Sequence, residues 1–157
     1  MNAADRAKFF KLLQEDIKET EMQTNLIPPH DDLSETLRVL MPVTDEGDPC
    51  LLEIMVSNFV EEADMVIFYT TLIGKIGAGY EDLLRALPKW NLDCPLGAFS
   101  IFETPEMKQL YHKYTILFDP DTDPADLEDN VMFHLMLLYE VVSRKFEEAR
   151  ELSQGKG

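Results

Sequence analysis

The chain has 157 residues, of which 45% are hydrophobic, and its 30 acidic against 14 basic residues give a formal net charge of −16. This acidity argues against nucleic acid and against an anionic membrane surface as partners, because their phosphates would be repelled. It favours solubility and attraction of basic partners. The length fits one domain, which we expect to span residues 1–154, with residues 155–157 as a frayed tail.

Cysteine content and the absence of long apolar runs indicate the compartment. Cys50 and Cys94 are too few and too far apart for a disulfide framework or a zinc ribbon, so both are expected to be reduced. The N-terminus lacks the apolar core of a signal peptide, and no apolar run reaches the ~18–20 residues of a membrane span. We therefore expect a cytoplasmic protein.

The first half of the chain predicts a helix followed by strands. Residues 3–20 read as an amphipathic helix, because apolar residues recur there at helical spacing. Residues 24–32 contain Pro28 and Pro29 and are predicted to be a connector. Three strands follow, joined by short turns that favour an antiparallel meander. We place these strands at residues 36–43, 50–59 and 65–73.

The second half predicts a helix, a hairpin and a long final helix. Tyr80 begins a helical pattern that ends around Pro88 to Asn91, and residues 98–102 and 110–118 read as paired strands. The final helix begins at Asp123 and Pro124, and its apolar stripe is expected to pack across the sheet. That stripe comprises Leu127, Val131, Leu135, Leu138, Val142, Phe146 and Ala149.

The predicted order is α-β-β-β-α-β-β-α. Strand runs separated by helices, rather than alternating with them, indicate an α+β fold with an antiparallel sheet and flanking helices.

The glycine-rich turn at residues 74–79 is the first candidate for chemistry, since it joins a strand to a helix, where phosphates often bind. Its order is G-x-x-G-x-G, whereas the dinucleotide fingerprint is G-x-G-x-x-G, and it lacks the G-K-[ST] ending of a P-loop. A tight turn explains Gly74, Gly77 and Gly79 better. A nucleotide or small-molecule site at this turn remains the alternative.

The sequence contains no complete metal-binding or catalytic motif. The run from Asp119 to Asp123 resembles the start of a calcium loop, but Pro124 and Asn130 occupy the positions that need glycine and glutamate. The three histidines show no metal-ligand spacing, and we expect His112 to be a hydrogen-bonded core or edge residue. No nucleophile–base spacing is present. We therefore expect no cofactor, no metal and no catalytic residue.

Three stretches carry a family resemblance: residues 87–101 (LPKWNLDCPLGAFSI), 111–118 (YHKYTILF) and 123–127 (DPADL). Together with the element order, they resemble the type III secretion chaperone-like fold of class I secretion chaperones and the YbjN-type family. The resemblance implies a non-catalytic, bacterial protein-binding module that is often dimeric. Secretion chaperones hold an extended segment of a partner along their surface, whereas YbjN-like proteins have regulatory roles.

The leading functional expectation is a protein-binding module, either chaperone-like or a regulatory adaptor. By period two, the sheet side facing away from the helices should carry the partner-binding residues Leu51, Met55, Tyr111, Lys113 and Leu117. Such a mixture of aromatic, methionine and polar residues is typical of adaptable surfaces. A dimer mate, a loop or the first helix could instead cover this side. Open sheet edges also favour a homodimer.

Overall fold

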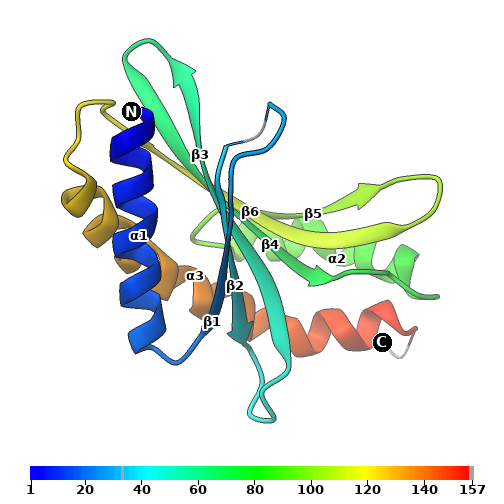
Figure 1. The fold of residues 1–157 in the computed structure, drawn as a ribbon. Helices are drawn as coiled ribbons and strands as arrows, with labels where there is room; N and C mark the ends of the chain where they lie inside the picture. Colours follow the sequence, from blue (N-terminus) through cyan, green and yellow to red (C-terminus); the bar gives the residue numbers. More distant parts are fainter. Residues whose placement is uncertain (33, 156–157) are drawn as a thin grey trace.

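The computed structural model describes residues 1–32 and 34–155, which form three helices and six strands (Figure 1). The strands make one antiparallel sheet in the order β1-β2-β3-β4-β6-β5. The predicted α+β class is therefore confirmed. In chain order the elements are α1 (Ala3–Glu19), β1 (Gln23–Ile27), β2 (Thr36–Pro42), β3 (Pro49–Val60), β4 (Ala63–Ile73), α2 (Tyr80–Asp93), β5 (Ala98–Glu103), β6 (Lys108–Phe118) and α3 (Pro124–Ser153).

The segment predicted as a connector, residues 24–32, begins with an additional strand. β1 pairs antiparallel with β2, from Gln23 opposite Leu40 to Ile27 opposite Thr36. The two prolines follow this strand and end it, rather than excluding regular structure from the whole segment. An edge strand has a neighbour on one side only, so a short, largely polar sequence is sufficient. Four strands, not three, therefore separate α1 from α2.

The period-two pattern of the strands divides the sheet into two faces. One face is buried along its length and forms the core with the helices. Its fully or nearly fully buried side chains include Leu37, Val39, Met41, Leu52, Ile54, Val56, Val66, Phe68, Phe99, Leu110 and Ile116.

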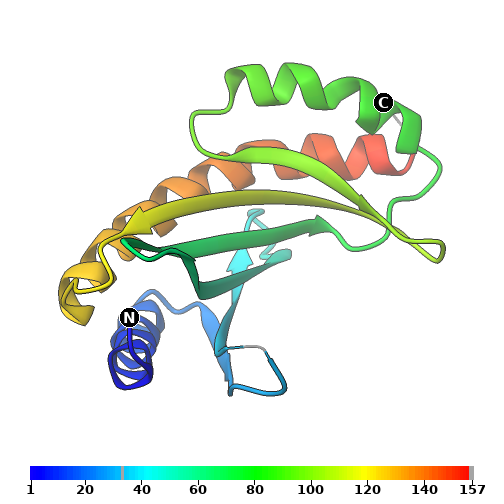
Figure 2. The same ribbon diagram turned by 90° about the horizontal axis from the view of Figure 1, so that it is seen from above.

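All three helices of the described chain pack on this buried face. The α1 side chain Gln14 donates from Nε2 to Thr24 Oγ1 in β1 at 3.1 Å. Trp90 of α2 meets Phe99 of β5 edge-on, with ring centroids 5.7 Å apart. α3 contacts β4, α1 and α2, and Figure 2 shows α2 running alongside the C-terminal half of α3. None of the helices in the described residues is long and apolar enough to cross a membrane.

The long helix α3 begins and packs as the sequence predicts. Asp123 caps it by accepting a hydrogen bond at Oδ1 from the Ala125 backbone N–H at 2.9 Å, with Pro124 in the first turn. The predicted apolar stripe, from Leu127 to Ala149, is no more than 5% exposed at any position. Gly155 follows the helix with φ 77°, while residues 156–157 of the predicted tail lie outside the described residues.

The interface between α1 and α3 contains a pair of carboxyl groups. Phe9, Phe10 and Leu13 of α1 are fully buried, and Glu128 of α3 is only 5% exposed. Burial raises the pKa of Glu128 to about 8, and hydrogen bonding and charge from the neighbouring Asp16 act in the same direction. Near neutral pH, Glu128 is therefore mostly protonated and can donate to the Asp16 carboxylate.

Candidate partner-binding face

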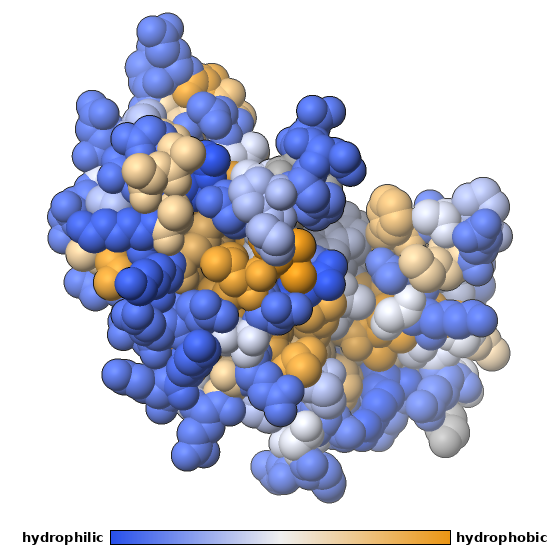
Figure 3. Space-filling view, in the orientation of Figure 1, coloured by the Kyte–Doolittle hydropathy of each residue, from blue (hydrophilic) through white to orange (hydrophobic). Residues whose placement is uncertain are grey.

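The second face of the sheet, which we call the outer face, lies open. Within residues 1–32 and 34–155 no helix packs on it, and its side chains are half-buried or exposed along β2, β3, β4 and β6. Figure 3 shows apolar side chains gathered where the strands cross in Figure 1, with hydrophilic ones around them. The outer-face residues are Arg38, Leu40, Leu51, Glu53, Met55, Met65, Ile67, Tyr69, Thr71, Tyr111, Lys113, Thr115 and Leu117.

The five residues predicted for partner binding all lie on the outer face. They form two groups, because β4 runs between β3 and β6. Leu51 and Met55 come from β3, whereas Tyr111, Lys113 and Leu117 come from β6.

The residues that join the two groups belong to β4 and are not among the five predicted partner-binding residues. Thr71 lies between Leu51 and Tyr111, and Ile67 pairs with Met55. Met65 and Tyr69 of β4 pair with residues of β6 in the same way. The period-two pattern of residues 65–73 could have placed these side chains on one face. Joining them to the predicted set requires the pairing of β4 with both neighbours.

One row of the outer face, which runs across β2, β3, β4 and β6, is aromatic and polar. The rings of Tyr69 and Tyr111 stack with centroids 4.7 Å apart and an interplanar angle of 18°. Arg38 Nε lies 3.2 Å from Glu53 Oε2 beside them. Burial raises the pKa of Tyr69, and the nearby Tyr111 and Glu53 add to the effect. The tyrosines thus combine contact area with hydroxyl groups that can bond to a partner.

Apolar residues of the outer face lie at its middle, where Met55 pairs with Ile67, and also at its sides. Leu117 is 57% exposed and Leu40 is 40% exposed, high values for leucines in strands. A shallow hollow of about 270 Å³ lies at the β1 side, lined by Gln23, Thr24, Asn25, Arg38, Leu40 and Leu51. The face therefore offers apolar anchor points on both sides of the tyrosine pair.

The two edges of the sheet differ. On the free side of β5, Asn91 accepts from the Phe99 N–H at 2.7 Å and donates to the Phe99 carbonyl at 2.9 Å. The Asn91 amide thus occupies the backbone positions that another strand would use. At the opposite edge, β1 pairs with β2 along one side only. A further strand could therefore not form hydrogen bonds to the Phe99 backbone at the β5 edge.

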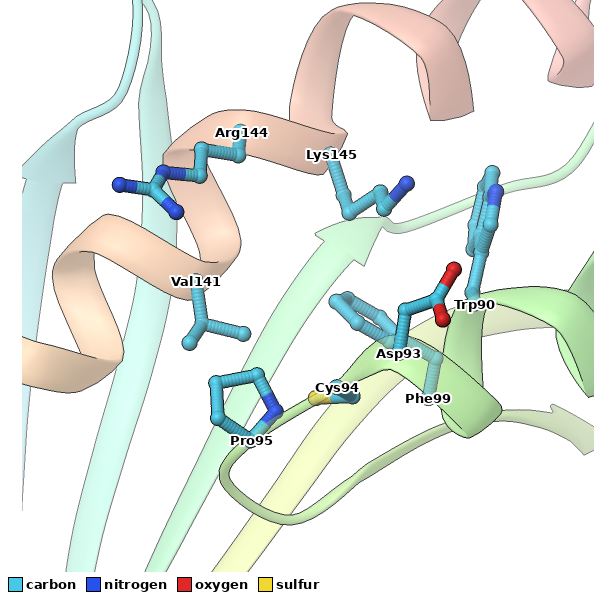
Figure 4. A pocket seen from close by; sticks show the side chains of 8 residues that line it. All are labelled: Trp90, Asp93, Cys94, Pro95, Phe99, Val141, Arg144 and Lys145. Atoms are coloured by element: carbon cyan, nitrogen blue, oxygen red, sulfur yellow. The ribbon is translucent and has the colours of Figure 1, made fainter.

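A second hollow, which Cys94 helps to line, lies between α2, β5 and α3 (Figure 4). Its volume of about 100 Å³ is below the roughly 300–1,000 Å³ of ordinary ligand sites. Cys94 Sγ also lies 3.8 Å from His112 Nε2. His112 Nε2 lies 2.6 Å from the Leu96 carbonyl, and because that oxygen can only accept, Nε2 carries the proton. The Cys94 thiol donates to the same carbonyl at 3.0 Å. His112 Nε2 therefore offers no lone pair to activate Cys94.

His112 behaves as the buried core histidine that the sequence predicts. It is fully buried, and burial lowers its pKa, while the hydrogen bond to Leu96 opposes that change. Its ring meets Phe99 edge-on at 4.8 Å. The residue fixes the loop after α2 against β6.

The glycine-rich turn at residues 74–79 packs against the C-terminal end of α3. The Gly79 N–H donates to the Ser153 carbonyl at 3.1 Å, and the Gly77 N–H donates to Ser153 Oγ at 3.3 Å. A Cβ on Gly79 would stand 1.4 Å from the Leu152 carbonyl oxygen. The glycines thus allow close approach of two backbones. Their N–H groups point at a helix C-terminus, whose partial negative charge disfavours phosphate.

The aspartate run before α3 serves as turn and cap. The Asp119 side chain accepts from the Asp121 N–H at 2.8 Å, and Asp123 caps α3. Across the described ranges, no group of three or more histidine, cysteine or acidic side chains could hold a metal ion.

No protein-family model matches the chain, and no curated protein matches it. The fold and the outer face together define the class: an α+β protein whose helices cover one side of an open, six-stranded antiparallel sheet.

Proposed function

We propose that this protein is a non-catalytic, cytoplasmic protein-binding module, chaperone-like or adaptor-like, that holds an extended segment of a partner protein on its outer face. The observation that carries the proposal is the open sheet face itself. It presents leucine, methionine and stacked tyrosine side chains that no helix of the described chain covers.

The composition of the outer face suits an extended chain. Met55 and Met65 have flexible side chains that adapt to different partner residues. The Tyr69–Tyr111 pair supplies rigid contact area with hydroxyl groups at its margin. Side chains of an extended segment alternate in direction, so every second one would meet this face.

Charge favours a basic partner segment. The net charge of −16 attracts cationic chains over a distance set by salt screening. On the outer face, Arg38 already pairs with Glu53, whereas Lys113 is exposed. The attraction therefore comes from the whole molecule rather than from a single acidic site.

The resemblance to secretion chaperones supports the same role, because surface capture of an extended partner is what that resemblance implies, whereas the resemblance to YbjN-like proteins implies a regulatory role. β1 is a departure from the order on which the resemblance was based. The proposal therefore depends on the outer face, and the resemblance to the chaperone-like family is only additional support for it.

The test compares two outer-face variants with a matched surface control. Peptides that bind the wild-type protein would be selected from a displayed library of extended sequences, and their affinity measured by calorimetry. Met55→Asp and Tyr111→Asp should each abolish peptide binding, because each replaces an apolar or aromatic contact with a charge that must lose its water when the segment binds. Leu92→Asp on α2, where the side chain is 85% exposed, should leave binding unchanged.

Thermal unfolding separates loss of binding from loss of fold. The proposal requires that the outer-face variants keep a midpoint close to that of the wild type, since their side chains are only half-buried. Full binding by a folded Met55→Asp, Tyr111→Asp double variant would place the site elsewhere. Failure to select any peptide would reject the extended-segment proposal.

A further inference from the structure

An apolar band crosses the outer face from its middle to the end at which β3 turns into β4. Met55 pairs with Ile67, and Met65 pairs with Leu117, so four large apolar side chains lie on neighbouring positions of β3, β4 and β6. Leu117 is 57% exposed, and Phe59, beside the β3–β4 turn, is 59% exposed. We call Met55, Met65, Ile67 and Leu117 the apolar band. An exposed group of this kind marks a binding surface.

The apolar band contains no charged side chain. The outer-face positions beside it carry hydroxyl groups and belong to Thr36, Ser57 and Thr115. The charged residues of this face lie in the aromatic and polar row, where Arg38 pairs with Glu53. Lys113 belongs to the same row, about 13 Å along β6 from Leu117. The band therefore selects apolar side chains of a partner, and charge acts only at its end.

Three acidic connections surround that end. In an antiparallel sheet with this strand order, the segment after β1, the β3–β4 turn and the segment after β6 lie at the same end, the upper one in Figure 1. Residues 28–32, 61–62 and 119–123 contain no lysine or arginine. Their exposed acidic residues are Asp31, Asp32, Glu61, Glu62, Asp119, Asp121 and Asp123.

Basic groups of α1 stand near the same end but do not neutralise these connections. Arg6 Nε lies 2.9 Å from Glu35 Oε2, and the N-terminal ammonium of Met1 pairs with Asp64. Lys8 is exposed on α1, which packs on the opposite, buried side of the sheet. Within the described ranges, no ion pair involves an acidic side chain of the β3–β4 turn or of residues 119–123. Their charge is therefore available to a partner.

We infer that the partner segment runs along the sheet from the Tyr69–Tyr111 pair to the apolar band, and that it carries lysine or arginine residues beside its apolar ones. This inference rests on the proposed function and names the chemistry of the partner. From Tyr111 to Leu117 the distance along β6 is about 20 Å, which an extended segment of about six residues spans. Alternate side chains of the segment would lie on the band, and its basic residues would reach the acidic connections.

Charge distinguishes this occupant from the alternatives. The acidic connections would repel an anionic membrane surface. A second copy of this chain would bring another net charge of −16 toward the same end, which opposes self-association there. The outer face itself holds no unpaired acidic side chain, but the connections at its end add a local attraction to that of the whole molecule. That attraction acts within about one Debye length, so it selects the residues next to the apolar ones.

Two synthetic peptides test the inference on the full-length chain. Both contain the same short core with leucine or valine at alternate positions, and they differ in carrying lysines or glutamates at both ends. The lysine peptide should bind, as measured by fluorescence anisotropy, and should weaken as salt rises. The glutamate peptide should not bind. Leu117→Asp should abolish binding of the lysine peptide while circular dichroism shows unchanged folding, because Leu117 is exposed.

A triple charge reversal isolates the acidic connections from the rest of the molecule. The substitutions Glu61→Lys, Glu62→Lys and Asp121→Lys change exposed side chains for which no ion pair is formed within the described residues. Together they should weaken binding of the lysine peptide by about tenfold, because three exposed attractions become repulsions.

The matched control makes the same change of net charge at the opposite end of the sheet, with Asp45→Lys, Glu46→Lys and Glu106→Lys. It should bind the lysine peptide within about twofold of the wild type. Equal losses in the two triple variants, or equal binding of the two peptides, would overturn the inference. Binding that is lost in Tyr111→Asp but kept in Leu117→Asp would overturn it and leave the proposed function standing. Binding of neither peptide would also overturn it, whereas the proposed function fails only if the displayed library yields no peptide.

Discussion

Replacement of Gly79 by alanine tests the packing of the glycine-rich turn on α3. The new Cβ would stand 1.4 Å from the Leu152 carbonyl oxygen and 2.9 Å from the Gly155 backbone nitrogen. Both obstacles are backbone atoms, so a side-chain rotation cannot relieve the contact. The turn must move away from the helix end.

The size of the effect follows from what that movement breaks. The hydrogen bonds from the Gly77 and Gly79 N–H groups to Ser153 would be lost, at about 0.5–1.5 kcal/mol each. Overpacking adds about 1–3 kcal/mol. The free energy of unfolding should therefore fall by about 2–6 kcal/mol, a large share of the ~5–15 kcal/mol of an ordinary domain.

The assay is urea unfolding followed by the fluorescence of Trp90, the only tryptophan, which is 3% exposed in the folded chain. Gly74→Ala is the matched control in the same turn, because a Cβ there meets nothing within 4 Å. It should be neutral or stabilise by up to about 1 kcal/mol, through the lower entropy of the unfolded chain. A Gly79→Ala protein within about 0.5 kcal/mol of the wild type would refute the packing argument.

Three further measurements test the core, the sheet edge and the α1–α3 interface. Leu138→Ala should cost about 2–5 kcal/mol of unfolding free energy, whereas Leu92→Ala, at an 85% exposed position, should change it by less than about 0.5 kcal/mol. Asn91→Ala leaves the Phe99 N–H and carbonyl without their side-chain partner and should lower the urea midpoint, with a loss of about 1–3 kcal/mol. Since burial raises the pKa of Glu128 to about 8 from an ordinary 4.5, the folded state holds the extra proton between these values, so stability should fall as pH rises through that window. Glu128→Gln should flatten this pH dependence, and an unchanged slope would show that another group is responsible.

The helices and central strands could be predicted from the sequence because their apolar spacing is regular. The stripe from Leu127 to Phe146 continues through five helical turns, and every member is buried. β3 and β4 alternate between buried and half-buried positions for most of their length, which fixes both faces.

β1 could not be predicted, because its sequence carries a weak pattern. Only Leu26 and Ile27 are apolar in its five residues, and the strand exists because β2 offers an unpaired edge. Strand pairing depends on tertiary structure, so the strand propensity of residues 23–27 alone could not predict it. The same limit applies to the outer face, since β4 joins the two predicted groups only through its register with β3 and β6.

The Asn91 contact shows a further limit of sequence reasoning. An asparagine near a helix end is ordinarily read as a local feature of that end. Here its amide bonds to Phe99, eight residues later, and closes part of a sheet edge. Only the position of α2 beside β5 brings the two groups together.

The packing of α1 against α3 has a consequence for synthesis of the chain. α1 leaves the ribosome well before α3, yet Phe9, Phe10 and Leu13 lie buried in a fold in which α1 packs against α3. Roughly 100 residues separate the two helices, which takes about 5–20 s at ordinary translation rates. Throughout that interval the apolar side of α1 is available to any hydrophobic surface nearby. The nascent chain therefore exposes α1 until α3 has been made, and a slower codon run before α3 would lengthen that exposure.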